Sequence, residues 1–452
     1  MRAQFDYVRY LLLTSFWFLP GLMVLVAVGL AFATLYLDYG RVVEAVEEAP
    51  WVYTPSAEGA RELLSTTAGS LITVTSLVFS MTLVTLTLAS NQLGPRLLRT
   101  FMDDRVNQIV LGTFSGTFIY HLLILRSVRT GVEEFVPLVS LAFAQIMVVA
   151  SVLLLIYFIH HLALSIQADT VIARVAEDLE QAIGTLFPPA DTPARLPAAS
   201  TMAPDFESRG APFPVQGSGY VQAIDFQLLC DMATAHDLAI RLDRRPGDFV
   251  VANGPAGRIY PSGRADSEIC KAASRAIVLG QARTPTQDIA FYVKALNEIA
   301  LRALSPGIND VFTALTCIDR LGEFLAAVMK RSPAQEVYWD DKGNPRIFLF
   351  PVTFDELLDA CLGEIRRAGS RQLAVIARLL GTLEALADFV RVPIHLESLQ
   401  AQLEALAGVA RNASLEPLDH ASLENRIARV EAKLTDLRRS HPALMADSDD
   451  AG

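Results

Sequence analysis

Long uncharged apolar stretches follow one another through the first third of the chain. Four of them can be separated, at residues 21–37, 63–90, 108–125 and 135–167. A helix needs about 20 apolar residues to cross a bilayer core of about 30 Å, and the second and fourth stretches exceed that length. The pattern therefore predicts four transmembrane helices, at residues 17–37, 65–89, 108–126 and 137–160.

The segment ahead of the first span, residues 1–16, mixes aromatic, aliphatic and charged side chains. It fits an amphipathic helix at the membrane surface, with Trp17 at headgroup level and Pro20 in the first turn of the span. The alternative is a cleaved signal peptide, whose apolar region would be about 7–15 residues long. The apolar region here is longer, which favours a retained span.

Arginine positions predict the orientation of the spans, because loops rich in Lys and Arg stay in the cytoplasm. Segment 1–16 carries two arginines and loop 90–107 three, whereas loop 38–62 has two arginines among six acidic residues. We therefore expect both termini in the cytoplasm.

Beyond the spans, the helical apolar rhythm continues and predicts that the fourth helix extends through residues 168–187. Seven prolines then mark residues 188–214 as an extended linker. Residues 215–262 predict a small α+β unit, in which Asp225 caps a short helix and Asn253-Gly254 forms a hairpin turn. Residues 263–441 predict an all-helical domain, and residues 442–452 a disordered tail.

The predicted fold class is therefore mainly α, with a four-helix transmembrane domain over residues 1–167 followed by a cytoplasmic α+β unit and a helical domain. Apolar residues spaced by four and three form a seam in the last helix. This seam fits packing within one chain and oligomerisation equally well: Leu423, Ile427, Val430, Leu434 and Leu437.

Composition narrows the function classes. The chain has 452 residues, of which 52% are hydrophobic and 19% charged, with a formal net charge of −11. Average soluble chains are about 45–50% apolar and about 25% charged. The apolar excess of this chain is moderate, which indicates that only part of it lies in a membrane. The acidic balance argues against nucleic-acid binding, and the lipid bilayer is the expected partner.

Motifs for catalysis, cofactors and metals are missing from the sequence. There is no GxSxG, HExxH, Walker loop or Rossmann fingerprint, so no enzyme activity and no cofactor are expected. Each of the four cysteines is at least 40 residues from the next, which predicts free thiols and no metal site: Cys230, Cys270, Cys317 and Cys361.

The second span is unusual because twelve Ser or Thr residues lie between positions 65 and 90. Several recur at helical spacing on one face, which gives the candidate pore-lining residues Thr66, Ser70, Thr73, Ser76, Ser80 and Thr87. One interpretation is close helix packing, since small residues let spans approach and hydroxyls bond locally. The other is a water-lined permeation path.

Two further places near the membrane could carry function. Within the spans, His121 is the clear ionisable candidate, with Gln145 as a polar companion. After the second span, a helix-breaking turn precedes two arginines. This loop anchors the chain to anionic lipid or forms a gate: Gly94, Pro95, Arg96 and Arg99.

The densest polar motif lies in the C-terminal part. Thr284, Pro285 and Gln287 match a capping box at the start of a helix. Arg302 can pair with Glu298 four residues earlier, and Asp310 can cap the next helix. The functional alternative is a polar cluster at an interface or ligand site, formed by Arg283, Asp288, Arg302, Asn309 and Asp310.

Several of these motifs in order make the chain similar to a known family. They are the run Asn91-Gln92-Leu93-Gly94-Pro95-Arg96-Leu97-Leu98, Gly219-Tyr220-Val221-Gln222, Arg245-Pro246-Gly247-Asp248-Phe249-Val250, Gln287-Asp288 and Ser305-Pro306-Gly307-Ile308-Asn309-Asp310. The chain to about Arg391 resembles the DUF2254 family of predicted bacterial membrane proteins. It departs from the pattern at Gly94, where a serine is expected, and at Val311, where a proline is expected. The resemblance implies a bacterial membrane protein and offers no site to transfer.

Two functions fit this sequence best. The first is a homo-oligomeric channel of the inner membrane, with the second span lining the path for ions. The second is a membrane-anchored sensor or scaffold whose cytoplasmic domain binds a ligand or partner. A membrane-embedded enzyme is the weakest reading, because no nucleophile and base can be paired.

Overall fold

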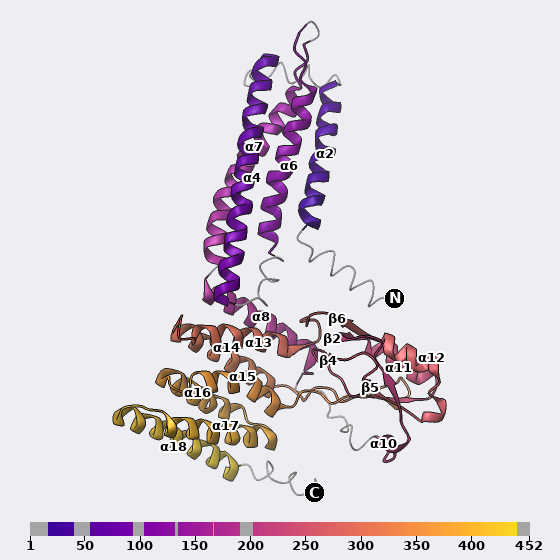
Figure 1. Ribbon diagram of the computed structural model, residues 1–452, viewed down its shortest axis with the longest axis vertical. Coiled ribbons are helices and arrows are strands. Elements are labelled where there is room, and N and C mark those ends of the chain that lie inside the picture. The colour runs from indigo at the N-terminus through magenta and orange to yellow at the C-terminus, as the bar shows by residue number, and fades with distance from the viewer. Residues whose placement is uncertain are drawn as a thin grey trace. The chain divides into compact units, whose positions relative to one another are not determined.

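The computed structural model describes residues 17–39, 55–93, 104–131, 134–165, 167–189 and 202–440. The chain forms two compact units, Met1–Thr170 and Val171–Gly452. They are called the membrane unit and the C-terminal unit below, and Figure 1 shows the elements of both. As predicted, the protein is mainly helical, with four apolar helices followed by a mixed α/β region and further helices.

The membrane unit contains four helices that are long and apolar enough to cross a bilayer. They are α2 (Phe18–Tyr39), α4 (Ala57–Leu93), α6 (Arg105–Ser127) and α7 (Leu138–Ser165). Each corresponds to one predicted span, with α4 beginning eight residues earlier than expected and α7 ending five later. The prediction of four transmembrane helices is confirmed.

Helix α6 is the centre of this bundle and contacts the other three helices (Figure 1). In the most apolar 18-residue stretch of α6, 50% of the residues are buried, whereas 17–22% are buried in the corresponding stretches of the other three helices. Its contact with α2 is close because α6 carries glycine at two positions four residues apart. A Cβ at Gly112 would lie 2.6 Å from Met23 Sδ, and one at Gly116 would lie 3.3 Å from Ala27 Cβ. This is the small-residue seam that membrane helices use to pack without a hydrophobic driving force.

The predicted extension of the fourth span is wrong in one respect. Helix α7 ends at Ser165 and a separate helix, α8 (Ala168–Leu186), begins three residues later. Polar Gln167, which is not helical, stands at the break. Helix α8 has an amphipathic pattern and buries Val171, Ile172 and Val175 within the C-terminal unit.

Two small sheets follow. The larger has the order β1-β5-β3-β8-β7, and the smaller has the order β4-β2-β6. Helices α11 (Phe226–Ala235) and α12 (Ser267–Arg275) accompany them. The strands are β1 (Ala211–Pro214), β2 (Gly219–Ile224), β3 (Ala239–Leu242), β4 (Phe249–Val250), β5 (Pro255–Tyr260), β6 (Ile277–Gly280), β7 (Val337–Trp339) and β8 (Pro345–Phe348).

The sheets correct three expectations. The turn at Asn253-Gly254 forms, with Asn253 at φ +63°, but β4 and β5 on either side of it belong to different sheets. Residues 263–441 are not all helical, because β6, β7 and β8 lie there. The expected linker at 188–214 includes a short helix, α10 (Phe206–Arg209), and strand β1 in its described part. Long-range pairing decided these cases, for example Ile240 of β3 with Ile347 of β8.

The rest of the C-terminal unit is an array of three helix pairs. Figure 1 shows them stacked in two rows, with α13, α15 and α17 in one and α14, α16 and α18 in the other. Leu321, Leu325, Leu379 and Leu383 are fully buried between α14 and α16. The helices are α13 (Ile289–Ala303), α14 (Val311–Met329), α15 (Phe354–Ala368), α16 (Leu373–Leu386), α17 (Pro393–Asn412) and α18 (Pro417–Ser440).

The seam of the last helix packs within this array. Helix α18 contacts α16 and α17, and four of the five seam residues are buried there: Leu423, Ile427, Val430 and Leu434. Packing within one chain therefore accounts for the pattern that left oligomerisation open. The four cysteines are free, as predicted.

Candidate functional site

The hydroxylated face of α4 lies on the outside of the helix bundle. All six candidate residues, Thr66, Ser70, Thr73, Ser76, Ser80 and Thr87, are exposed. The bundle contacts the opposite face, where Leu64, Leu71 and Val78 are buried. The hydroxyls of Thr73 and Ser76 each donate to the carbonyl four residues earlier, at 2.9 Å. These hydroxyls bond the backbone of their own helix, and the face does not pack against the other three helices of the bundle.

The two intramembrane polar candidates do not form a pair. His121 on α6 is 1% exposed, and its Nδ1 lies 2.7 Å from the Thr117 carbonyl of its own helix. Thr117 in turn bonds Ser151 of α7 at 3.3 Å. Gln145 lies on an exposed face of α7. The surroundings of His121 are those of a residue that links helices.

A buried polar network that the sequence reading missed joins three helices. Asp38 at the end of α2 accepts hydrogen bonds from the backbone N–H groups of Val139 and Ser140 at 2.8 and 3.0 Å, and from the Ser140 hydroxyl at 2.5 Å. The Tyr120 hydroxyl donates to the Ser140 carbonyl and lies 2.9 Å from the Thr34 hydroxyl. Asp38 thus caps the first turn of α7 from another helix. The signal was available, because this acidic residue ends an otherwise uncharged stretch.

A second carboxylate acts in the same way at the start of α6. Asp104 accepts from Val106 N–H at 2.9 Å, which makes it the N-cap of the helix. Its other oxygen lies 2.8 Å from Nε2 of His161 on α7. The loop candidates Gly94, Pro95, Arg96 and Arg99 lie outside the described residues.

The polar cluster predicted in the C-terminal unit divides into two parts. Asn309 accepts from Gln372, and Asp310 caps α14 by accepting from Thr313 N–H at 3.2 Å. Arg302 lies 3.5 Å from Glu298 on its own helix. These three residues therefore have partners of their own around the turn between α13 and α14.

Arg283 and Asp288 form the other part. Two guanidinium nitrogens of Arg283 lie 2.7 and 2.6 Å from Asp288 Oδ2. Asp288 is 5% exposed. Burial raises the pKa of its carboxyl above the usual value, and the charge of Arg283 partly opposes that rise.

The capping box expected at Thr284 to Gln287 does not form, because α13 begins only at Ile289. The Gln287 side-chain amide instead bonds strand β2, accepting from Ile224 N–H at 2.8 Å and donating to Ile224 carbonyl at 3.1 Å. Thr284 donates to the Gln222 carbonyl. The backbone of β2 beyond its short pairing with β4 binds these side chains in place of the helix terminus.

Gln287 and Asp288 line a largely apolar cavity of the C-terminal unit, with a volume of about 310 Å³. Segment Asp243-Arg244-Arg245-Pro246 from the end of β3 meets Gln287-Asp288-Ile289 from the start of α13 there. The two motifs lie some forty residues apart in the sequence. Gly247 allows this approach, since it adopts φ +92° and a Cβ at this position would overlap both Arg283 and Asp288.

The walls of this cavity are aromatic and aliphatic. Phe226 and Tyr338 stack with ring centroids 4.9 Å apart. Phe350 also lines the cavity, with the Arg241 guanidinium 5.8 Å from its ring centroid. Other apolar lining residues include Leu186, Phe187, Ile224, Leu242 and Leu349. A concave, largely apolar site with a few polar groups is the usual form of a small-molecule site.

One wall is the segment that directly follows α8. Arg331 donates to the Phe187 carbonyl at 2.8 Å, and Ser332 donates from its backbone to Pro188 at 3.2 Å and from its hydroxyl to Pro189 at 3.1 Å. This segment, residues 187–189, is called the strap below. It is held to the end of α14 by hydrogen bonds to its backbone.

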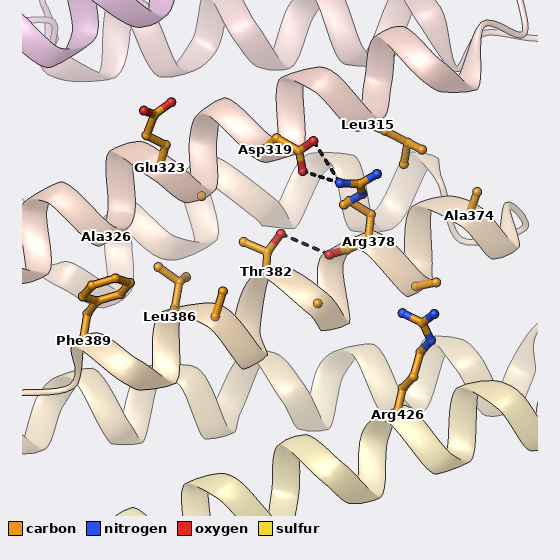
Figure 2. A pocket seen from close by; sticks show the side chains of 14 residues that line it. Leu315, Asp319, Glu323, Ala326, Ala374, Arg378, Thr382, Leu386, Phe389 and Arg426 are labelled. Carbon is orange, nitrogen blue, oxygen red and sulfur yellow. Dashed lines mark hydrogen bonds and ion pairs between the residues drawn. The ribbon is translucent and has the colours of Figure 1, made fainter.

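A second hollow, of about 650 Å³, lies over α14, α16 and α18. Figure 2 shows its polar side chains, with Arg378 donating to both oxygens of Asp319 at 3.0 Å. Six of its fourteen lining residues are alanine or glycine. The described residues of the chain contain no group of three His, Cys, Asp or Glu side chains that could hold a metal ion.

Comparison with known proteins gives a consistent family assignment. The family model described as predicted membrane protein, DUF2254, matches residues 13–385. Two relatives are the uncharacterized protein Rv1290c of Mycobacterium tuberculosis and the uncharacterized protein Mb1321c of Mycobacterium bovis. Each is 30% identical over 436 residues, covering 95% of this chain and 82% of the relative. No solved structure matches the chain significantly. The chain therefore belongs to the DUF2254 family of predicted membrane proteins.

Proposed function

We propose that this protein is a membrane-anchored sensor that binds a small ligand in the cavity of its C-terminal unit. The observation that carries this proposal is the convergence of Arg245-Pro246 and Gln287-Asp288 on one apolar cavity of about 310 Å³. A cavity of this size and lining suits a small organic molecule. The role is one of binding rather than catalysis.

The connection of the strap to the membrane helices supports a sensing role. Phe187 and Pro188 line the cavity, and α8 leads from them back to within three residues of the end of α7. Helices transmit displacement along their length because their backbone is fully hydrogen-bonded. A ligand that moves the strap against its bonds to Arg331 and Ser332 thereby acts on a helix that adjoins a span.

The proposal includes a location. Both termini and the C-terminal unit lie in the cytoplasm, and the spans cross the inner membrane. The arginines of segment 1–16 and loop 90–107 support this orientation. A fluorescent protein fused after residue 452 tests it, because such a fusion fluoresces when the C-terminus is cytoplasmic and stays dark when it is exported.

A neutral aromatic probe tests the cavity. The full chain is placed in lipid nanodiscs and titrated with N-phenyl-1-naphthylamine, whose fluorescence rises in apolar surroundings. The cavity-filling variant Ala334→Trp should remove one saturable site, while Ala432→Trp on the exposed face of α18 should retain it. Equal binding by both variants and the parent chain would overturn the proposal.

A second candidate rests on a different observation, the exposure of the hydroxylated face of α4. We propose, as that alternative, a homo-oligomeric channel in which Thr66, Thr73, Ser80 and Thr87 face the ion path. Small hydroxylated residues allow helices of several copies to approach and also tolerate water.

Cross-linking and flux measurements test the channel. Cysteine at position 73 should cross-link neighbouring copies in membranes, whereas cysteine at exposed Ile146 on α7 should not. In liposomes, Thr73→Trp and Ser80→Trp should each block ion flux. Absence of flux from the unmodified chain under voltage, tension and osmotic shock would remove this candidate.

A further inference from the structure

The charges around the cavity are not evenly matched. Three of the four charged residues that line it have partners: Asp243 binds Arg241 at 2.8 Å, Arg245 binds Glu356 at 2.7 Å, and Asp288 binds Arg283. The fourth is Arg244. It donates from Nε to the Pro255 carbonyl at 3.3 Å, and none of the described carboxylates lies within ion-pair distance of it. Arg244 is therefore a half-buried cation whose charge is uncompensated within the described chain.

One neutral donor also faces the cavity unused. Tyr338 is half-buried on β7, and its ring is held in place by stacking on Phe226. None of the described residues hydrogen-bonds its hydroxyl. Burial raises the pKa of this phenol, so that it stays protonated at neutral pH and can donate. A stationary donor of this kind is suited to an acceptor atom on a ligand.

The rest of the cavity lining also favours a ligand with an apolar body and a negative charge. Apart from the groups named above, the lining contains Gln287, whose amide is already bound to β2, and Gln335, which donates to the Val337 carbonyl. The other lining side chains are apolar. An apolar body buries this surface favourably, whereas a cationic head would meet Arg244 without a free carboxylate.

We propose that the cavity binds an anionic amphiphile, a compact apolar body that carries a single carboxylate, sulfonate or phosphate. Arg244 binds the anionic group, Tyr338 donates a hydrogen bond to an acceptor on the ligand, and the aromatic walls enclose the body. This inference rests on the proposed sensor function and names the class of its ligand. An anion of this kind has two possible sources, a soluble metabolite or a molecule released from the bilayer.

A matched pair of probes isolates the anionic group. 1-Anilinonaphthalene-8-sulfonate has the skeleton of N-phenyl-1-naphthylamine with one sulfonate added. Both are titrated against the full chain in zwitterionic nanodiscs, and the signal of Ala334→Trp is subtracted. The sulfonate should bind at least about tenfold more tightly than the neutral probe, because a hydrogen bond to a charged group adds roughly that factor.

Variants assign the preference to residues. Arg244→Gln should abolish the preference for the sulfonate and leave the affinity for the neutral probe unchanged. Tyr338→Phe should weaken binding of the sulfonate about three- to tenfold. Arg429→Gln, on the exposed face of α18, should behave as the parent chain. If Arg244→Gln also loses the neutral probe, Arg244→Lys serves as the second variant and should retain a reduced preference.

Competition distinguishes the two sources. Octanoate added to the buffer should displace the sulfonate probe if the ligand is soluble, and lysophosphatidic acid built into the disc should displace it if the ligand comes from the bilayer. Displacement by neither overturns the inference. Equal binding of the two probes also overturns it, while leaving the sensor proposal in place, and saturable binding of neither probe overturns both.

Discussion

In the membrane unit, Leu25 and Ile146 are 68% and 62% exposed, whereas in the C-terminal unit Leu379 and Leu383 are fully buried. Polar groups show the reverse contrast. Among the described residues, Asn107 Oδ1 is the one buried side-chain atom of the membrane unit without a hydrogen-bond partner, and seven such atoms lie in the C-terminal unit. The spans cannot rely on water, so hydroxyls such as those of Thr73 and Ser76 bond their own helix, and Asp38 accepts three hydrogen bonds. The C-terminal unit can leave groups such as Tyr338 open for a ligand.

This contrast explains where we place function. In the bundle, the buried side chains of Asp38, Thr117 and His121 already have structural partners. In the C-terminal unit, the leucines between α14 and α16 are fully buried, and a largely apolar cavity remains beside β3. Four substitutions test the comparison, beginning with the one expected to have the largest effect.

Removal of the buried carboxylate should damage the bundle most. Asp38→Ala leaves the N–H groups of Val139 and Ser140 and one hydroxyl without acceptors. We expect a loss of about 3 kcal/mol, which corresponds to a fall of roughly 6–12 °C in the unfolding midpoint of a unit of this size. Thermal unfolding in nanodiscs measures it. Glu62→Ala on the exposed face of α4 is the control, and an Asp38→Ala midpoint equal to that of the control would contradict the capping role.

Substitution of Gly247, beside the cavity, should have the next largest effect on stability. Gly247→Ala forces a Cβ into Arg283 and Asp288 at φ +92° and should cost about 2 kcal/mol. It should also abolish the saturable binding of N-phenyl-1-naphthylamine. Gly307→Ala is the matched control, because a Cβ there meets nothing within 4 Å. Retention of both stability and probe binding by Gly247→Ala would show that the cavity does not depend on this contact.

A pH effect should follow from His395, which is 8% exposed and has its ring centroid 4.5 Å from that of Phe354. Burial, assisted by the charge of Arg391, lowers the pKa of its imidazole to about 4. The unfolded chain, with a pKa near 6.5, binds the proton more readily. Stability is therefore complete above about pH 6.5 and falls as the pH is lowered toward 4, by on the order of 1–2 kcal/mol after allowance for solvent screening.

Scanning calorimetry of the full chain at pH 7 and pH 4.5 measures this loss. His395→Gln removes the titrating group, so the C-terminal transition of this variant should change less between the two pH values than that of the parent chain. Replacement of His420, which lies in the first turn of α18, serves as the control. An equal acid-induced change in the parent chain and His395→Gln would assign the effect to other groups.

The smallest effect is expected on the hydroxylated face of α4. Thr73→Val removes an exposed hydroxyl that bonds only the Gly69 carbonyl of its own helix. The free energy of unfolding of the single chain should change by less than about 0.5 kcal/mol. A larger loss that depends on protein concentration would instead show that this face contacts another copy, which would favour the channel.

Local physical chemistry made some features predictable from the sequence. Four apolar stretches gave four helices because a long uncharged segment has no stable alternative in a bilayer. Asp225 caps α11, as predicted, by accepting from Leu228 N–H at 3.0 Å, and Asp310 caps α14. These interactions join residues three apart, so the pattern that encodes them is visible in a short window.

Features that join distant segments were not predictable in this way. Strand β8 pairs with β3, which lies about a hundred residues earlier in the chain. Gln287 bonds Ile224 of β2 and does not cap a helix. The glycine seam at Gly112 and Gly116 became meaningful only beside Met23 and Ala27. Likewise, Arg244 is an ordinary arginine in the sequence, and the absence of a described carboxylate beside it follows from where β3 ends. The sequence by itself determined the elements and their caps through local interactions, whereas tertiary packing decided which faces meet, and with them the cavity.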